Sequence, residues 1–369
     1  MGFLNNLFGA KEKKISSYAD FWEWFSENES TFRKIVKTKD TKTIEEKFFS
    51  RLGPKLNELR DGIFYLVGML NDSTVDLVLT ADGSPKNISF VEELVEAAPA
   101  IAGWQFTPLK QPMGVGFGLT MNGIIHSQDT LSFYPTDRPD KPDLVDITVF
   151  HRDLNDSNKQ SIQSGAYILL ENYLGELNFL ENIDELRFLP PSDAEKDLIP
   201  IDALENYLQT RQALFVEKYD GVRIFTENDA YSALEAELES GQKLIAVINT
   251  DLLNWNRKAS HPWMLVITIG FDGTKNNGMP DSPTFERLQE IEDSICAELR
   301  DVDGYLNIGH QTTNGERDIF LACVDFRKPS KVLHEAQQRY GSSFPFDYQI
   351  YKDKYWQTVS RFSPSDDVS

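Results

Sequence analysis

Residues 264–271 read MLVITIGF and residues 284–302 read TFERLQEIEDSICAELRDV, and these two runs decide the fold of the C-terminal part of the chain. The first run is apolar and rich in β-branched residues, which predicts a buried strand. In the second run Leu288, Ile291 and Ile295 recur three and four residues apart, which predicts one buried face of a helix. The pair therefore predicts a strand followed by a helix.

The segments that follow extend this pattern to the end of the chain. YLNIGHQT (305–312) and DIFLACVDF (318–326) flank Asn314-Gly315, a strong signal for a β-hairpin. A helix is expected at PSKVLHEAQQRY, opened by Pro329, and a final strand at FPFDYQIY. The resulting order β-α-β-β-α-β is that of the ferredoxin-like fold, so we expect a ferredoxin-like C-terminal domain.

Upstream of this core we expect the C-terminal domain to begin at residue 214 and to run to 369. Its first elements are predicted as a strand near 214, a helix over 227–240 capped by Thr226, and a strand at LIAVINT (244–250).

Residues 1–213 are predicted to form an N-terminal α+β domain that opens with two helices. The chain as a whole is therefore expected to be an α+β protein of two domains. The elements expected here are helices at 18–37, 43–60 (kinked or broken at Pro54), 88–98, 159–174 and 201–212, a hairpin at 63–81, strands at 103–109, 129–134, 143–150 and 183–189, and an irregular segment at 111–130.

The charge of the chain limits its partners. The formal net charge is −21, from 58 acidic and 37 basic residues. Nucleic-acid affinity comes from Lys and Arg that neutralise phosphates, so we expect no nucleic-acid partner. Anionic membrane surfaces are disfavoured for the same reason, and basic protein surfaces are favoured. The acidity could also serve solubility alone.

The cellular compartment is predicted from cysteine usage and hydropathy. Only Cys296 and Cys323 occur, and both lie in apolar patterns typical of core residues. No stretch approaches the length of a transmembrane helix, and residues 1–14 are too short for a secretory signal. We therefore expect a cytoplasmic protein without a membrane span.

No catalytic, metal or cofactor site is predicted. The five histidines form no HExxH pattern, and neither paired CxxC nor GxSxG occurs. The polar loop at 272–281 lacks the glycine and glutamate that a calcium loop requires at positions six and twelve. The glycine-rich stretch at 114–118 does not lead into a helix, as a nucleotide loop would.

Acidic residues on two of the predicted helices are the candidate partner-binding site. Glu286, Glu290 and Asp293 follow one another at i, i+4 and i+7 opposite the apolar face. The predicted helix 227–240 adds Glu235 and Glu239. Such a stripe can dock a basic protein, although a merely solvated face gives the same pattern.

Segments 260–295 and 351–362 resemble the bacterial family of unknown function numbered 695. That family has a Pro-Trp strand, a Gly-Met-Pro or Gly-Leu-Pro turn, a helix with Glu-Asp, and an Asp-Tyr-Trp segment. The resemblance implies no reaction, because the family has no established catalytic residues. The residues that carry it are Pro262, Trp263, Gly278, Met279, Pro280, Glu292, Asp293, Asp353, Tyr355 and Trp356.

Two weaker resemblances concern the rest of the chain and the fold. The preceding half is similar to a module that precedes such domains in bacteria. The acidic ferredoxin-like domain is distantly similar to the regulator of ribonuclease E activity B, a protein inhibitor of an RNA-degrading enzyme, by analogy of fold alone.

The leading functional hypothesis is a non-enzymatic binding or regulatory protein whose acidic surface engages a basic protein, such as a nuclease. Two alternatives remain open. One is an enzyme of unfamiliar type with a carboxylate-lined site between the domains. The other is an immunity protein that neutralises a toxin.

Overall fold

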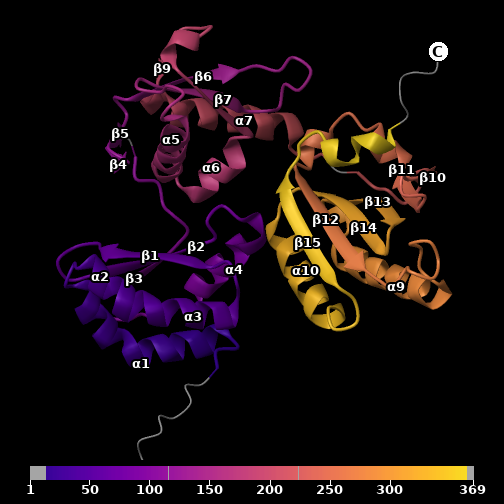
Figure 1. The fold of residues 1–369 in the computed structure, drawn as a ribbon, viewed down its shortest axis with the longest axis horizontal. Helices are drawn as coiled ribbons and strands as arrows, with labels where there is room; N and C mark the ends of the chain where they lie inside the picture. The colour runs from indigo at the N-terminus through magenta and orange to yellow at the C-terminus, as the bar shows by residue number, and fades with distance from the viewer. Residues whose placement is uncertain (1–13, 115, 223, 364–369) are drawn as a thin grey trace, which may run out of the picture. The chain divides into compact units, whose positions relative to one another are not determined.

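The computed structural model describes residues 14–114, 116–222 and 224–363 (Figure 1). Two of the sequence predictions concern residues outside this description. The prediction that the chain has no secretory signal uses residues 1–13, and the glycine-rich stretch includes residue 115. The chain divides into two compact units, each treated separately below. Unit 1 contains the described residues up to 114 together with 171–177, and unit 2 contains those from 116 to 170 and from 178 onward.

Unit 1 is an α+β unit that begins with helices, as predicted. Its sheet has the order β1-β2-β3, in which β1 and β2 are antiparallel and β2 and β3 are parallel. The second predicted helix, at 43–60, is interrupted by a π-helical segment, η1. It is not broken at Pro54, which lies inside the continuous helix α3. The elements are α1 (Tyr18–Val36), α2 (Thr41–Ile44), η1 (Glu45–Phe49), α3 (Ser50–Leu59), β1 (Phe64–Met69), β2 (Val75–Thr80), α4 (Pro85–Glu96) and β3 (Trp104–Pro108).

An aromatic cluster forms the core of unit 1. The ring of Phe25 on α1 lies 5.0 Å from that of Trp104 and 5.4 Å from that of Phe106, both on β3. Trp22, one turn before Phe25, contacts Phe106 at 4.4 Å between ring centres. The apolar face predicted for the first helix therefore covers the sheet.

The first part of unit 2 contains a four-stranded sheet of order β8-β7-β6-β9. Asn122-Gly123 makes a small hairpin inside the segment predicted to be irregular, because both residues adopt the positive φ that a tight hairpin turn needs. The elements of this part of the chain, in which residues 171–177 of α5 and α6 belong to unit 1, are β4 (Leu119–Met121), β5 (Ile124–His126), β6 (Leu131–Thr136), β7 (Asp146–His151), α5 (Lys159–Leu174), α6 (Glu176–Asn182), β8 (Glu185–Leu189), η2 (Pro191–Asp193), β9 (Ile199–Pro200), η3 (Ile201–Ala203) and α7 (Leu204–Tyr219).

The strand predicted near residue 214 is wrong. Helix α7 continues through this position to Tyr219, because Tyr207, Leu208, Arg211 and Phe215 keep a helical spacing toward the rest of unit 2. The domain boundary predicted at 213/214 falls within this helix and stays a prediction.

The second part of unit 2 contains a six-stranded sheet of order β10-β11-β13-β14-β12-β15, with every pair antiparallel. From β12 onward the elements follow the predicted order β-α-β-β-α-β (Figure 1), and the ferredoxin-like assignment itself stays a prediction. The elements are β10 (Tyr231–Glu237), β11 (Lys243–Asn249), α8 (Thr250–Leu253), η4 (Lys258–Ser260), β12 (Trp263–Gly270), α9 (Ser282–Glu298), η5 (Asp301–Asp303), β13 (Tyr305–Thr313), β14 (Glu316–Cys323), α10 (Arg327–Tyr340), β15 (Phe346–Lys352) and η6 (Gln357–Phe362).

The helix predicted over 227–240 is wrong, and the segment contains strand β10 instead. Its register with β11 pairs Ala233 with Val247 and Glu235 with Ile245. Ala, Leu and Glu favour helices in isolation, but the free edge of β11 supplies a ladder of backbone hydrogen bonds. Tertiary pairing therefore decides the structure of this segment.

The two faces of the six-stranded sheet are covered differently. Helix α9 packs on the face that holds His310 and Arg317, through its residue Glu292. On the other face Trp356 joins a buried cluster with Ile308 and Phe320. Among the described residues no helix is both long and apolar enough to cross a membrane.

Candidate functional site

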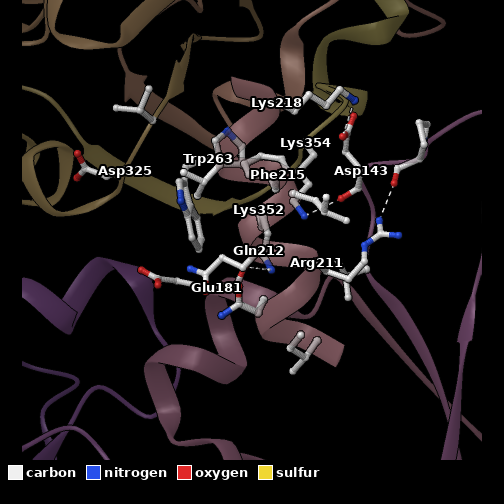
Figure 2. Close-up of a pocket in the computed structure, with 18 of the residues that line it drawn as sticks. Asp143, Glu181, Arg211, Gln212, Phe215, Lys218, Trp263, Asp325, Lys352 and Lys354 are labelled. Atoms are coloured by element: carbon white, nitrogen blue, oxygen red, sulfur yellow. Dashed lines mark hydrogen bonds and ion pairs between the residues drawn. The ribbon is translucent and has the colours of Figure 1, made fainter. Parts of the chain in front are cut away.

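A pocket of about 430 Å³ lies in unit 2, and side chains from segments far apart in the sequence line it (Figure 2). Its volume falls in the range of small-molecule sites. The residues around it are Pro142, Asp143, Val145, Glu181, Asn182, Leu208, Arg211, Gln212, Leu214, Phe215, Val216, Lys218, Pro262, Trp263, Val324, Asp325, Phe326, Lys352 and Lys354.

The apolar wall of the pocket is built from aromatic residues. Trp263, the first residue of β12, is buried and meets the ring of Phe326 edge-on, with 4.6 Å between ring centres. Phe215 on α7 lies under the ammonium of Lys354, at 5.1 Å from Nζ to the ring centre. Such a wall favours a ligand with an apolar or aromatic body.

Two lysines from the end of β15 share one carboxylate at this pocket. Nζ of Lys354 lies 2.7 Å from Oδ2 of Asp184, and Nζ of Lys352 lies 3.4 Å from Oδ1 of the same residue. Lys352 also donates to the backbone carbonyl oxygens of Ile183 at 2.7 Å and Glu181 at 3.2 Å. Because one carboxylate carries one negative charge, the pair leaves a surplus ammonium in a buried place.

The electrostatics identify Lys352 as the perturbed member of the pair. Burial lowers the pKa of Lys352 to about 8; the carboxylate of Asp184 opposes this shift and the neighbouring ammonium of Lys354 adds to it. A lysine of this kind is partly neutral near physiological pH, and a neutral amine is a nucleophile and a base.

Asp143 is the second polar hub of the pocket. Its carboxylate accepts hydrogen bonds from Lys218 at 2.7 Å, Tyr219 at 2.9 Å and Tyr355 at 3.0 Å, while its carbonyl oxygen accepts one from Lys354 at 2.9 Å. Although burial opposes the shift, these hydrogen bonds hold the pKa of Asp143 below its usual value. Asp143 therefore stays ionised and fixes the loop before β7.

Positive side chains outnumber carboxylates in the pocket lining. The carboxylates are Asp143, Glu181 and Asp325, and the cations are Arg211, Lys218, Lys352 and Lys354. This mixed lining differs from the carboxylate-lined site considered as an alternative on the sequence. Among residues 14–114, 116–222 and 224–363, no group of three or more metal-ligating side chains gathers.

Part of the residue pattern that carries the family resemblance converges on this pocket. Pro262 and Trp263 line it, and Tyr355 hydrogen-bonds to Asp143. Asp353 lies beside the pocket and accepts hydrogen bonds from the backbone of Gln357 and Thr358, which starts η6. These side chains therefore shape the segment that contains both lysines.

Trp356, the last residue of that segment, has a structural role. Its indole is 1% exposed and donates to the carbonyl oxygen of His261 at 3.0 Å. Its φ of +53° is unusual for a bulky residue, so burial of the ring holds the backbone in this conformation.

The Gly278-to-Pro280 turn lies apart from the pocket and also has a structural role. The carbonyl oxygen of Gly278 accepts a hydrogen bond from Gly315, and a Cβ at Gly278 would come within 2.9 Å of the backbone of Asn314. The carbonyl oxygen of Pro280 accepts one from Asn276. The turn therefore fixes the loop before α9 onto the β13–β14 hairpin.

Glu292 belongs to a separate buried network under α9. Its Oε2 lies 2.9 Å from Nδ1 of His310 and 3.8 Å from Nη1 of Arg317, which is 1% exposed. Although burial opposes the shift, these partners hold the pKa of Glu292 below its usual value. Burial and the charge of Glu292 raise the pKa of the Cys296 thiol to about 12, so this thiol stays protonated at neutral pH.

The acidic residues predicted as a partner-binding site are all exposed, but they do not all lie on helices. Glu286, Glu290 and Asp293 lie on α9, as predicted. Glu235 lies on strand β10, where it pairs with Lys243 at 2.7 Å, and Glu239 lies in the turn after that strand. The predicted acidic residues therefore lie on one helix, on one edge strand and in the turn after that strand.

No direct signal in the sequence marks the pocket lysines. Lys352 and Lys354 lie in the segment YKDKYW beside the family-pattern residues Asp353 and Tyr355. Lysines are usually exposed, however, and no rule of sequence spacing identifies a buried pair of them.

The comparisons with known proteins concern the C-terminal part alone. No curated protein and no solved structure matches the chain. Residues 239–362 match the model of a family of unknown function, DUF695, so the resemblance first seen at the Pro-Trp, Gly-Met-Pro and Asp-Lys-Tyr-Trp segments holds for this part of the chain.

Proposed function

We propose that this chain is a binding or regulatory protein that engages a basic protein partner through an acidic surface of its C-terminal part. The observation that carries the proposal is an open face at the β10–β11 edge of the six-stranded sheet, together with exposed acidic side chains on β10 and α9. Tyr231 on β10 is 50% exposed and Ile245 on β11 is 36% exposed.

The sheet register shows which side chains share the face on which α9 packs. Glu235 pairs with Ile245, Ile245 with Thr312, and Thr312 with Arg317, so these four side chains share one face. Helix α9 covers the Arg317 end of this row through Glu292. At the β10–β11 end Tyr231 and Ile245 stay accessible.

Exposed acidic side chains lie on the same strand as this open sheet face, which we define by Tyr231, Ala233 and Ile245, and on helix α9. Glu235 stands on the strand side, and α9 presents Glu286, Glu290 and Asp293 to solvent on the helix side. A segment with apolar residues on one side and Lys or Arg around them matches such a surface in both shape and charge.

Two simpler explanations predict a different outcome. Charges on an edge strand also protect it from pairing with other chains, and acidity alone maintains solubility. Neither explanation makes binding depend on where the acids lie. The position of the acidic residues is therefore what an experiment has to vary.

A capture experiment with two charge-matched variants tests the proposal. The first variant carries Glu286→Lys, Glu290→Lys and Asp293→Lys on α9. The control carries Asp193→Lys, Glu195→Lys and Asp197→Lys in an exposed loop elsewhere in unit 2. Both change the net charge equally, and each is used as bait in lysate at about 50 mM and about 300 mM salt.

We expect a basic protein that wild type and the loop variant retain at low salt, and that the α9 variant loses by about tenfold or more. Ile245→Ser should weaken the same capture at both salt concentrations, because it removes an apolar contact rather than a charge. Equal capture of that protein by the α9 variant and the loop variant contradicts the proposal.

A further inference from the structure

We infer that Lys352 is a covalent attachment site for a small carbonyl compound, an aldehyde or ketone with an apolar body, which binds in the unit 2 pocket and forms an imine with the side-chain amine. This inference concerns a different surface from the proposed partner site and does not depend on it.

The shared carboxylate selects which lysine loses its proton. Asp184 can neutralise one ammonium, and Lys354 is the closer partner, at 2.7 Å against 3.4 Å for Lys352. When Lys352 deprotonates, Asp184 keeps Lys354 as its counterion. The lysine pair and Asp184 therefore lose their surplus positive charge when Lys352 becomes a free amine.

The hydrogen bonds of Lys352 suit the neutral amine as well as the ammonium. A neutral amine has two N–H groups, and the carbonyl oxygens of Glu181 and Ile183 accept two hydrogen bonds from Nζ. In the ammonium the third N–H faces a carboxylate oxygen of Asp184 at 3.4 Å, and in the neutral amine rotation about the Cε–Nζ bond turns the lone pair away from that oxygen and toward a ligand. The backbone thus holds the nitrogen in place in both protonation states.

The further charges around the pocket each have partners of their own. Asp143 is engaged by Lys218, and the carboxylate of Asp325 accepts hydrogen bonds from Tyr305 and from the backbone at the start of α10. Arg211 donates to the carbonyl oxygens of Pro142 and Leu144. Glu181 pairs with Arg327 at 3.7 Å. The charge of Glu181 also raises the pKa of Lys352, so it acts with Asp184 against the larger effect of burial.

The chemistry requires no further reactant. The lone pair of Lys352 attacks the carbonyl carbon, and one of the two amine protons moves to the carbonyl oxygen to give a carbinolamine. When the C=N bond forms, the C–O bond breaks and this oxygen leaves as one water molecule with the second amine proton, with no change of oxidation state. Trp263, Phe215 and Phe326 offer the apolar surface that would hold the body of the ligand.

Reductive trapping on the full-length protein tests the site. The probe is benzaldehyde with sodium cyanoborohydride near pH 7.5, and peptide mass spectrometry locates the benzylated lysines. About a quarter of an amine with pKa about 8 is neutral at that pH, against about one in a thousand for an ordinary lysine. We expect Lys352 to be labelled at least about tenfold faster than the exposed Lys37 and Lys275.

Three controls make the result specific. In denaturing urea the preference for Lys352 should disappear, because it depends on the folded pocket. Glyoxylate, which lacks an apolar body, should show less preference than benzaldehyde. Lys352→Arg, which keeps a charge and hydrogen-bond donors, should remove the fast site, and Lys354→Arg should leave a fast site at residue 352.

The wild-type protein alone is sufficient to overturn the inference. Labelling of Lys352 that is no faster than that of Lys37 and Lys275 in the folded protein contradicts it, whether or not the variants fold. A preference for Lys352 that persists unchanged in urea also contradicts it, since the reactivity would then come from the local sequence and not from the pocket.

Discussion

His126 is a buried histidine whose environment disfavours its charged form. It is fully buried in unit 2, and neither ring nitrogen has a hydrogen-bond partner among the described residues. Burial lowers its pKa, and the neighbouring His151, whose ring lies 4.9 Å away, contributes to the shift. Gly165 on α5 packs so closely that a Cβ there would come within 2.2 Å of the His126 ring.

This environment predicts an acid-sensitive fold. The folded-state pKa of His126 lies below the unfolded value of about 6.5, so the unfolded state binds more protons. The free energy of unfolding should therefore fall as the pH drops below about 6.5, by at most about 1.4 kcal/mol per pH unit from this residue.

Urea unfolding from pH 8 to pH 5 measures this effect, with His126→Leu as the comparison. The leucine variant should gain stability relative to wild type as the pH falls, because it has no proton to bind. Parallel losses of stability in the two proteins over this range would assign the acid sensitivity to other residues.

At the scale of elements, the sequence predicted well where apolar periodicity was strong. The elements from β12 to β15 were recognised because each carries a continuous apolar run or a clear helical stripe. Segment 227–240 failed because Glu, Ala and Leu favour a helix locally, while the edge of β11 imposes a strand. The Asn122-Gly123 pair is itself a signal for a hairpin turn, but the many glycines around it led to the prediction of an irregular segment.

The pocket could not have been predicted in the same way. Trp263 was noted for the family pattern, but its neighbours Phe215 and Lys352 come from segments 48 positions before and 89 positions after it. Sharing of Asp184 by two lysines is a property of the folded chain, and periodicity reports only which face of an element is apolar. Surface acids were easier to predict, since exposure is the default for Glu and Asp.

The bulge in β13 gives a test at this scale. The register of β13 against β14 shifts between Asn307 and Gly309, and Gly309 has a φ of +131°. A Cβ at this position would lie 2.1 Å from the carbonyl oxygen of Val247 on β11. The glycine thus lets two strand backbones approach while Asn307 and His310 both reach Glu292.

Gly309→Ala should lower the free energy of unfolding by about 3 kcal/mol, from backbone strain and the clash with β11. Gly68→Ala in β1 is the matched control, because nothing lies within 4 Å of a Cβ there, and it should change stability by less than about 0.5 kcal/mol. Equal effects in urea unfolding would show that the bulge tolerates a side chain.

At the scale of the whole molecule, the chain contains two compact units. Unit 1 is built on the aromatic cluster around Phe25 and on the central strand β2. Unit 2 is built on its four-stranded and six-stranded sheets, with Leu265 of β12 in the larger one. Multidomain chains often unfold in more than one step, because each core loses its packing independently.

Leu77→Ala in β2 and Leu265→Ala in β12 form a matched pair for this test, since each removes the same atoms from a fully buried position on an interior strand. Each should cost about 2–5 kcal/mol in its own unit. Calorimetry of wild type should show two transitions, and each variant should lower the midpoint of one of them and leave the other in place. If both variants shift a single common transition, the two units unfold as one cooperative body. Protonation of His126 and substitution of Gly309, both in unit 2, would then lower the stability of unit 1 as well.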